Sequence, residues 1–419
     1  MSRILLATFG SLGDLHPYLA VGRALHARGH QARIAASPDY QDAIEAAGLE
    51  FAPMRPRIDA LGPRAEIARR LFHPLRGTQR LLHDIVMPHL RDAHADLSRA
   101  ATDADLLVSH PLTYTLPIVA QQQSKPWLSS VLAPMSFLSR HDPPAVAGFD
   151  VLRLARRFGP AVYELAFGLA RRAVRQWEAP LHVYRRELGL PPTRQVMTFE
   201  GQFSPHGTLA LFDALLARPQ ADWPAHTQLC GAALYDGVTD DSTQTDELRR
   251  FIDDGEPPLV FALGSSAVWI AGNYWLHAVE ASRQLKRRAV LLTGQNNLPR
   301  LPPGIRAFEY LPYSLVFPHA AVVVHQAGIG TLSQALRSGR PQLITPLAFD
   351  QPDNAARGAR LGVGRVLPFA RANTARLRIE LQRVLADPCH AEAAGSVAVR
   401  LKQSDGAGAA ADRIIAALG

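Results

Sequence analysis

The stretch AAVVVHQAGIGTLSQALRSGRPQLITPLAFDQPDN, residues 320–354, decides the fold. A short apolar run ends at His325, two glycines follow, and Thr331 then opens a segment with helical spacing. A second apolar run, 341–345, comes directly after that helix. Strand, helix and strand in this order form a βαβ unit, because parallel strands need a long crossover connection. The stretch therefore predicts a parallel sheet with a glycine turn at the carboxyl end of one strand.

The same alternation of strand and helix extends over most of the chain in two series. The segments expected as strands are 3–9, 31–36, 105–109 and 127–132 in the first series, and 258–263, 288–293, 305–308, 320–324 and 341–345 in the second. The segments expected as helices include 17–28, 40–47, 273–286 and 330–338. This pattern predicts an α/β fold with two Rossmann-like, doubly wound parallel sheets. Ligands bind beyond the carboxyl ends of such strands, so we expect the two sheets to face a central cleft.

The length of 419 residues suits about two domains. We expect a first Rossmann-like domain over residues 1–235, a linker over 236–246 and a second domain over 247–400. Residues 401–419 are expected to form a C-terminal helix that packs back on the first domain. Arg-rich segments with helical spacing, 64–91 and 150–186, are inserted in the first domain. They are either ordinary amphipathic helices or the wall of an apolar funnel or membrane-surface face.

Composition excludes several classes of protein. The chain is 47% hydrophobic and 20% charged, which rules out disorder, collagen and coiled coil. Its net charge is +8, but only three of the 45 cationic residues are lysines and the arginines are spread throughout, so we expect no nucleic-acid partner. The two cysteines, Cys230 and Cys389, are far apart and fit neither a disulfide scaffold nor a zinc site.

Hydropathy predicts a cytoplasmic protein. The first residues lack the long apolar region of a signal peptide, and no apolar run approaches the 18 residues that a membrane span needs. The diffuse basicity still allows peripheral contact with the anionic inner surface of the membrane.

The glycine turn after His325 predicts a phosphate or diphosphate site. Glycines between a strand and a helix leave backbone N–H groups bare, and the helix N-terminus adds partial positive charge. His325 could donate to the same phosphate. The alternative is an ordinary tight turn with a structural histidine. After the next strand, Asp350 and Gln351 offer a carboxylate and a carboxamide for adjacent sugar hydroxyls.

Taken together, this block resembles the nucleotide-sugar signature of glycosyltransferase family 1. The matching residues are His325, Gly328, Gly330, Thr331, Pro346, Asp350 and Gln351. The likeness covers the whole chain: GSLGDLHP (10–17) is similar to the first loop of bacterial members, and LGSS (263–266) to the opening loop of their second domain. Segments such as LYDG (234–237) and DQPDNA (350–355) look most like the rhamnolipid rhamnosyltransferases, with sterol and antibiotic glycosyltransferases next.

The resemblance implies a GT-B fold, with the acceptor bound by the first domain and a UDP- or dTDP-sugar by the second. The donor-binding residues it implies are Ser265, Ser266, Tyr310, Leu311, Tyr313, His325, Gly328, Gly330, Thr331, Asp350 and Gln351. Tyr310 matches the aromatic residue that stacks on the nucleobase. Two positions depart from the family pattern: Ser333, beside Gln334, replaces the ribose-binding Glu of plant relatives, and Tyr313 replaces a Gln. These departures leave ribose recognition and the choice between uracil and thymine open.

Glycosyl transfer needs a base beside the acceptor hydroxyl. Asp14 is the candidate, since family members place His or Asp three residues before the proline that is Pro17 here; its alternative role is a helix cap. His16 is a less favoured base. His110 ends the strand 105–109 and would either orient Asp14 or merely pack against Pro111.

We expect no metal and no cofactor. Asp103 and Asp105 form a DxD motif, but it precedes its strand, which puts the carboxylates at the wrong edge of the sheet. The acceptor-lining candidates are Phe9, His16, Met135, Phe137 and Phe158.

The sequence thus predicts an inverting, metal-independent hexosyltransferase acting on a hydroxyl of an apolar acceptor such as a hydroxy lipid, a phenol or a polyketide. The alternatives are a GT-B sugar-nucleotide 2-epimerase and a catalytically silent sugar-nucleotide-binding partner of another enzyme. The sugar, the nucleobase, the acceptor and the oligomeric state stay open.

Overall fold

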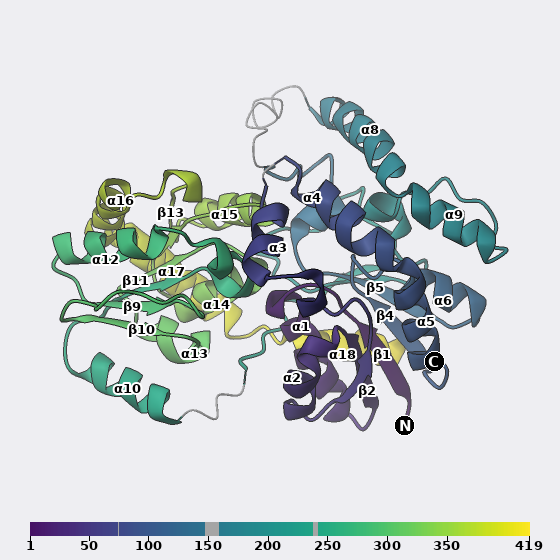
Figure 1. Ribbon diagram of the computed structural model, residues 1–419, viewed down its shortest axis with the longest axis horizontal. Coiled ribbons are helices and arrows are strands. Elements are labelled where there is room, and N and C mark those ends of the chain that lie inside the picture. The colour runs from purple at the N-terminus through teal and green to yellow at the C-terminus, as the bar shows by residue number, and fades with distance from the viewer. Residues whose placement is uncertain (74, 147–158, 238–241) are drawn as a thin grey trace. The chain divides into compact units, whose positions relative to one another are not determined.

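The computed structural model describes residues 1–73, 75–146, 159–237 and 242–419 (Figure 1). The chain divides into two compact units, one of Met1–Tyr235 with Asp405–Gly419 and one of Asp236–Ser404. Each unit is built on a parallel sheet with helices in the crossovers, so the predicted fold class is confirmed.

The first unit holds a seven-stranded sheet with the order β3-β2-β1-β4-β5-β6-β7, in which all neighbours are parallel. Its strands are β1 (Arg3–Ala7), β2 (Gln31–Ala36), β3 (Glu50–Pro53), β4 (Leu106–Ser109), β5 (Trp127–Val131), β6 (Thr208–Ala210) and β7 (Thr227–Leu229). The strand order reverses between β1 and β4, and ligands of doubly wound folds bind at such a switch point.

The second unit repeats this topology with six strands in the order β10-β9-β8-β11-β12-β13, again all parallel. Its strands are β8 (Leu259–Ala262), β9 (Ala289–Leu292), β10 (Ile305–Phe308), β11 (Val322–His325), β12 (Gln342–Ile344) and β13 (Gly364–Val366). Strands β8 and β11 therefore hold the positions that β1 and β4 hold in the first sheet.

Helices lie on both faces of each sheet (Figure 1). In the first unit they are α1 (Leu12–His26), α2 (Gln41–Ala46), α3 (Arg64–Leu71), α4 (Gly77–Arg80), α5 (Leu90–Ala100), α6 (Leu116–Gln122), α8 (Pro160–Trp177), α9 (Ala179–Glu187) and α18 (Gly406–Ala416). In the second they are α10 (Ser242–Asp253), α11 (Gly264–Ala267), α12 (Tyr274–Gln284), α13 (Tyr313–Val316), α14 (Ile329–Ser338), α15 (Gln351–Arg360), α16 (Thr374–Ala386) and α17 (Pro388–Leu401). The C-terminal helix α18 packs on the first unit, where Asp412 pairs with Arg28 at 2.6 Å.

The central strands are apolar because both of their faces are covered. One face of the first sheet packs against α5 and α6, and the core there includes Leu5, Leu97, Leu107 and Val119. In the second unit all four residues of β11 are buried, including its last one, His325. Continuous apolar runs are expected of strands buried on both faces.

Several boundaries differ from those expected. Helix α1 begins at Leu12 rather than near Pro17, because the side chain of Ser11 accepts a hydrogen bond from the N–H of Gly13 and caps the helix five residues earlier. Part of the expected linker 236–246 is helical, because Leu248 and Phe251 anchor α10 in the second core. Strands β3, β6, β7 and β13 were not expected from the sequence.

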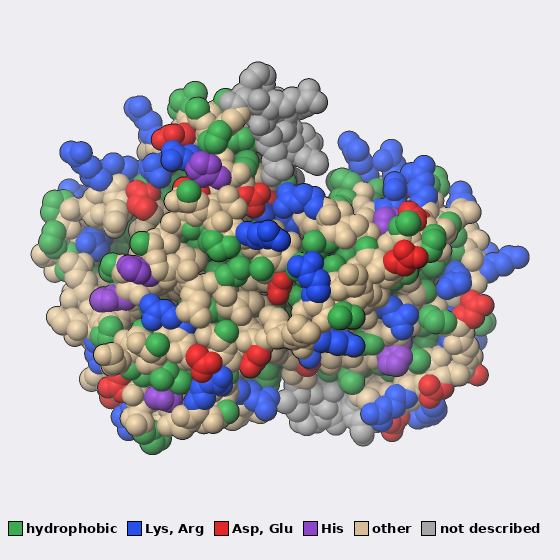
Figure 2. Space-filling view, turned by 180° about the vertical axis from the view of Figure 1, so that it is seen from behind, with side chains coloured by type: hydrophobic (Ala, Val, Ile, Leu, Met, Phe, Trp, Pro, Cys, Tyr) green, Lys and Arg blue, Asp and Glu red, His purple; other side chains and the backbone are tan. Residues whose placement is uncertain are grey.

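Cationic side chains are scattered over the face shown in Figure 2, with acidic and apolar ones between them. Many arginines have carboxylate partners at the surface, such as Arg3 with Asp103 and Arg91 with Glu187. Among the described residues, no helix is both long and apolar enough to cross a membrane.

Candidate active site

The predicted catalytic pair, Asp14 and His110, comes together at the carboxyl edge of the first sheet. Asp14 lies in the first turn of α1, and His110 follows the last residue of β4. The Nε2 atom of His110 is 3.4 Å from Oδ1 of Asp14. The Nδ1 atom of His110 accepts a hydrogen bond from the N–H of Leu112 at 3.2 Å, so in the neutral ring the proton sits on Nε2 and points at the carboxylate.

Asp14 also has the structural role considered as the alternative. Its Oδ2 atom accepts from the N–H of Ser11 at 2.7 Å and from the Ser11 hydroxyl at 3.0 Å, which completes a capping box. Gly10 makes room for this arrangement, because a Cβ there would lie 2.3 Å from Oδ2, and its φ of +138° favours glycine. The carboxylate is therefore both a cap through Oδ2 and the partner of His110 through Oδ1.

The side chain of Asp14 is partly open, with 31% exposure, whereas that of His110 is 5% exposed. Only Asp14 of the pair can therefore be approached directly by a substrate. His110 is enclosed further by Tyr18, whose ring meets it edge-on at 6.0 Å and whose hydroxyl is 2.6 Å from Ser130 Oγ. Tyr18 was not singled out from the sequence.

The remaining first-unit candidates lie in different surroundings. His16 is half-buried, with its ring edge-on to Tyr235 at 5.3 Å, and Phe9 belongs to the core under α5 and α6. Phe137 is also buried, stacked on Trp223 at 4.2 Å, so it supports the fold and is not an open lining residue as predicted. Met135 is half-buried, and Phe158 lies outside the described residues.

The predicted phosphate turn is formed as expected between β11 and α14. Gly328 is the residue before the helix, and Gly330 and Thr331 lie in its first turn. A Cβ on Gly330 would meet no atom within 4 Å, so the backbone there is open to a ligand. The helix has ten residues, and its bare N–H groups suit a diphosphate.

His325 does not point at this turn, which corrects its predicted role. Its ring is 0% exposed, its Nε2 atom is 3.0 Å from Oε1 of Gln342, and its Nδ1 atom accepts from the N–H of Ala327 at 3.1 Å. Burial lowers the pKa of His325 to about 4, so the ring is neutral at pH 7. These contacts fit the alternative given in the sequence analysis, a structural histidine. The strand β11 lies in the middle of the sheet, and the side chain of its last residue faces the interior.

Gln326, which the sequence analysis overlooked, occupies the place expected of His325. Its Nε2 atom donates to Thr331 Oγ1 at 3.3 Å and approaches the turn so closely that a Cβ on Gly328 would lie 2.9 Å away. A Cβ on Gly264 would lie 2.2 Å from the same atom. Its Oε1 atom is buried and has no hydrogen-bond partner among the residues that the structure describes. The sequence could have indicated Gln326 by its position as the first residue after β11, because ligands bind beyond the carboxyl ends of such strands.

The start of α15 supports the same turn. Asn354 donates to the carbonyl of Ala327 at 3.0 Å and to Oδ2 of Asp350 at 2.6 Å. Gln351 accepts from the N–H of Leu347 at 2.9 Å, so its carbonyl oxygen is occupied within its own turn. Asp350 and Gln351 thus lie at the same sheet edge as the glycine turn, and Asn354 links the two.

The other predicted donor residues follow β8 and β10 at this edge. Ser265 and Ser266 are half-buried in α11, and Tyr310 is 39% exposed, as a stacking ring requires. Leu311 is 1% exposed in the core, so only its backbone can contact a ligand. Tyr313 stacks on Phe317 at 4.4 Å, and burial raises the pKa of its hydroxyl.

The DxD motif lies at the opposite, amino edge of the first sheet. Asp103 pairs with Arg3 and Arg33, both at 2.6 Å, and Arg33 lowers the pKa of that carboxyl to about 2. Asp105 accepts from the backbone N–H of Arg3 at 2.8 Å. Within the described ranges, no group of three His, Cys, Asp or Glu side chains could hold a metal ion.

Comparison with known proteins decides the family. Residues 4–95 match the glycosyltransferase family 28 N-terminal domain, and residues 289–407 match the C-terminal domain of erythromycin biosynthesis protein CIII-like proteins. The chain is 31% identical to the O-mycaminosyltylonolide 6-deoxyallosyltransferase of Streptomyces fradiae over 93% of its own length and 91% of the relative's. The chain belongs to the GT-B glycosyltransferases. The resemblance seen in the sequence is thus confirmed, and with it the assignment as a hexosyltransferase.

Further relatives and solved structures agree with the assignment. The vancomycin aglycone glucosyltransferase of Amycolatopsis orientalis is 27% identical over 86% of this chain and 85% of its own. The kitacinnamycin glycosyltransferase structure superposes with a TM-score of 0.73 at 21% identity, covering 100% of this chain and 99% of its own. The structure of the glycosyltransferase VinC in complex with dTDP superposes with a TM-score of 0.68 at 21% identity, covering 99% of both chains. These structures share the fold.

Proposed function

We propose that this glycosyltransferase moves a hexose from a dTDP- or UDP-sugar to a hydroxyl of an apolar small-molecule acceptor, with inversion and without a metal. The observation that carries the proposal is the Asp14–His110 pair at a ligand-binding sheet edge. Family membership favours transfer over the epimerase and over the silent binding partner. The relatives named for O-mycaminosyltylonolide and the vancomycin aglycone support an acceptor of the antibiotic aglycone type.

In this reaction Asp14 acts as the general base. Its exposed carboxylate takes the proton of the acceptor hydroxyl while that oxygen attacks the anomeric carbon and the bond to the diphosphate breaks. His110 does not touch the substrate. Its Nε2 atom lies 3.4 Å from Oδ1 and fixes the place of the carboxylate, so His110 is a positioning residue and not a second base.

The donor's diphosphate is held by the second unit. The N-terminus of α14 supplies N–H groups at Gly330 and Thr331, and Gln326 supplies an amide beside them. Positive potential at this place stabilises the leaving group as its charge develops. Asp350 and Gln351 are placed for the sugar hydroxyls, and Tyr310 for the nucleobase. The neighbour solved with dTDP makes thymine nucleotides the first donors to test.

The test is a mass-spectrometric screen of dTDP-rhamnose, dTDP-glucose and UDP-glucose against macrolide aglycones, flavonoids and hydroxy fatty acids, with and without excess EDTA. We expect a glycoside that forms only when donor and acceptor are both present, at a rate that EDTA leaves unchanged. Sugar-nucleotide turnover without any acceptor would contradict the proposal. Loss of activity in EDTA that Mg²⁺ or Mn²⁺ restores would contradict its metal-independent step.

A further inference from the structure

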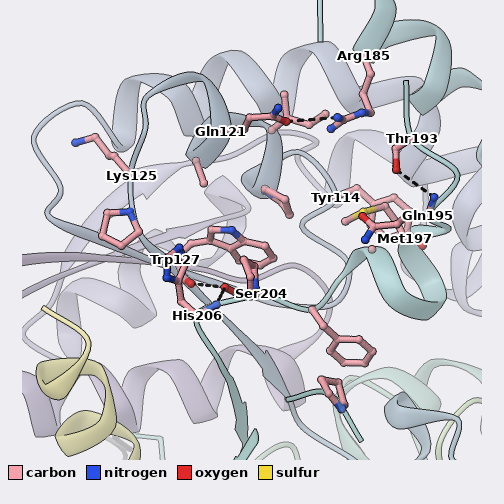
Figure 3. Close-up of a pocket in the computed structure, with 18 of the residues that line it drawn as sticks. Tyr114, Gln121, Lys125, Trp127, Arg185, Thr193, Gln195, Met197, Ser204 and His206 are labelled. Carbon is pink, nitrogen blue, oxygen red and sulfur yellow. Dashed lines mark hydrogen bonds between the residues drawn. The ribbon is translucent and has the colours of Figure 1, made fainter. Parts of the chain in front are cut away.

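A cavity in the first unit lies away from Asp14 and His110. It is a cavity of about 870 Å³ between α6, α9 and the chain segments that precede β5 and β6 (Figure 3). Trp127 opens β5, and Ser204 and His206 lie just before β6. Because the strands are parallel, their amino ends lie at the edge opposite to the one that holds the Asp14–His110 pair. Its volume is that of a small-molecule site.

The lining of this cavity combines an apolar floor with cationic walls. Trp127, Phe203 and Met197 supply large apolar surfaces, while Lys125 and Arg185 supply positive charge. Among the described residues that line it, none is Asp or Glu. Lys125 donates to the carbonyl oxygens of residues 102 and 104, so its charge has no counter-ion in these bonds.

Two nitrogen atoms on α9 lie buried in this wall and make no hydrogen bond to the described part of the chain. They are Nε of Arg185 and Nε2 of His182, one helical turn apart. The other contacts of Arg185 are weak, 3.4 Å from Nη2 to Oε1 of Gln121 and 3.4 Å to the carbonyl of Pro191. Within the described ranges Arg185 has no carboxylate partner. The residue as a whole is half-buried, so part of its guanidinium has lost water without gaining a charged partner among the described residues, and an anion at this place would compensate that loss.

The electrostatic potential at this wall of the cavity is positive, like the charges of Lys125 and Arg185. The charges of three arginines, residues 175, 185 and 186, add to burial in lowering the pKa of His182. Burial likewise lowers the pKa of Arg185. The carboxylate nearest in sequence, Glu187, is bound to Arg91. An anion at this wall would therefore meet attraction from several groups and repulsion from none that lines the cavity.

We propose that this cavity binds an amphiphilic anion, with its apolar body on Trp127 and Phe203 and its carboxylate or phosphate head on Arg185. The planar fork of a guanidinium matches both head groups. The site is separate from the donor and acceptor positions of the proposed function, because none of the residues assigned to them lines the cavity.

The test is calorimetric titration of the full chain with three twelve-carbon probes below their critical micelle concentrations: dodecyl phosphate, dodecanoate and neutral dodecanol. We expect at least one of the two anions to bind about tenfold more tightly than dodecanol, as one charge-assisted contact allows. Equal binding of all three probes would overturn the proposal. Comparing the two anions tells which head group is preferred.

Variants locate the site. Arg185→Gln should weaken binding of the preferred anion about tenfold and leave dodecanol unchanged. The matched control is Arg186→Gln, which removes an exposed charge that adds to the field but does not line the cavity, so it should weaken binding by no more than about twofold. If Arg185→Gln does not fold, Gln121→Glu places a carboxylate beside the guanidinium and should weaken the same anion. Anion binding that neither variant weakens would overturn the proposal.

Saturation with dTDP separates this cavity from the donor site. Anion binding at the cavity should persist unchanged when dTDP is in excess, because the turn at α14 belongs to the other unit. Loss of dodecyl phosphate binding under these conditions would place the probe at the nucleotide site and overturn the assignment. Failure of the glycosyl-transfer screen would not affect this result, since no step of the titration depends on catalysis.

Discussion

His110 and His325 stand at the carboxyl ends of equivalent strands of the two sheets, one residue out of step, and they have different surroundings. Each comes at the carboxyl end of the strand that neighbours the first strand of its sheet, β4 beside β1 and β11 beside β8. The ring of His110 faces a carboxylate that is partly exposed, whereas His325 donates to the buried amide oxygen of Gln342. His110 is the first residue after its strand and His325 is the last residue of its own, so the one-residue offset places the two rings on different faces and decides which of them lies in a site.

The largest effect should come from the open carboxylate. Asp14→Asn keeps the size and an acceptor oxygen for the cap, but it cannot accept the proton of the attacking hydroxyl. We expect single-turnover rates to fall about 10²–10⁴-fold, with dTDP affinity unchanged.

The matched control is Ser11→Ala, which removes the hydroxyl that caps α1 and leaves the Asp14 carboxylate. It should cost about 0.5–2 kcal/mol of stability in thermal or urea melts and keep turnover within a few-fold of the parent. If Asp14→Asn keeps near-parental turnover, Asp14 is only a helix cap. His110 would then have no catalytic partner, and both histidines would be structural.

The second prediction concerns His325, the buried histidine, and the pH dependence of the free energy of unfolding. The pKa of His325 is about 4 in the folded chain and about 6.5 when unfolded. Between these values the unfolded chain binds the extra proton, so stability is complete above about pH 6.5 and falls as the pH drops toward 4. At pH 4.5 the loss from this residue should be about 2–3 kcal/mol.

The measurement is urea unfolding at pH 7 and pH 4.5 for the parent and for His325→Asn, whose Oδ1 can still accept from Ala327. The variant should be less stable at pH 7 and lose less stability on acidification. Equal acid sensitivity of the two chains would show that His325 does not carry this proton linkage.

Much of the fold was predictable, because both sheets have strong apolar runs. Segments 31–36 and 305–308 match β2 and β10 residue for residue. The strands that were missed, such as β6 and β13, have three residues each, too few for a pattern in sequence. Tertiary pairing with a neighbouring strand defines them.

The part of the candidate site that depends on strand direction was predictable from the sequence. The sequence placed Asp14 and His110 at one sheet edge, since both follow parallel strands that are neighbours. It could not tell which side chain after β11 faces the ligand, because one residue of difference changes the face on which a side chain lies. Gln342 begins the next strand and accepts the hydrogen bond of the His325 ring. Nothing in the sequence indicates that these two side chains are in contact.

The third prediction contrasts the two neighbours at the end of β11. Gln326→Ala removes an amide beside the glycine turn and should raise the dissociation constant of dTDP about tenfold, the size of one hydrogen bond to a charged group. His325→Asn should leave that constant within about twofold, because its ring faces Gln342. Calorimetry on both variants decides between them. A larger loss of affinity in His325→Asn would restore the histidine as the diphosphate contact.

The smallest effect is expected of His110→Asn. The amide oxygen can still accept from the N–H of Leu112, as Nδ1 of His110 does, but nothing replaces the Nε2–H group that faces Asp14. Losing this contact, worth about 1 kcal/mol, should lower kcat about fivefold, with dTDP affinity and melting temperature nearly unchanged.

The decisive measurement is the double variant. If His110 acts only by positioning Asp14, adding His110→Asn to Asp14→Asn should cost nothing further, because the group that it orients is already gone. If the rate losses of the two single variants multiply in the double variant, His110 contributes to turnover independently of the carboxylate. The two histidines would then differ in more than their partners, and the ring of His110 would itself have to meet the substrate.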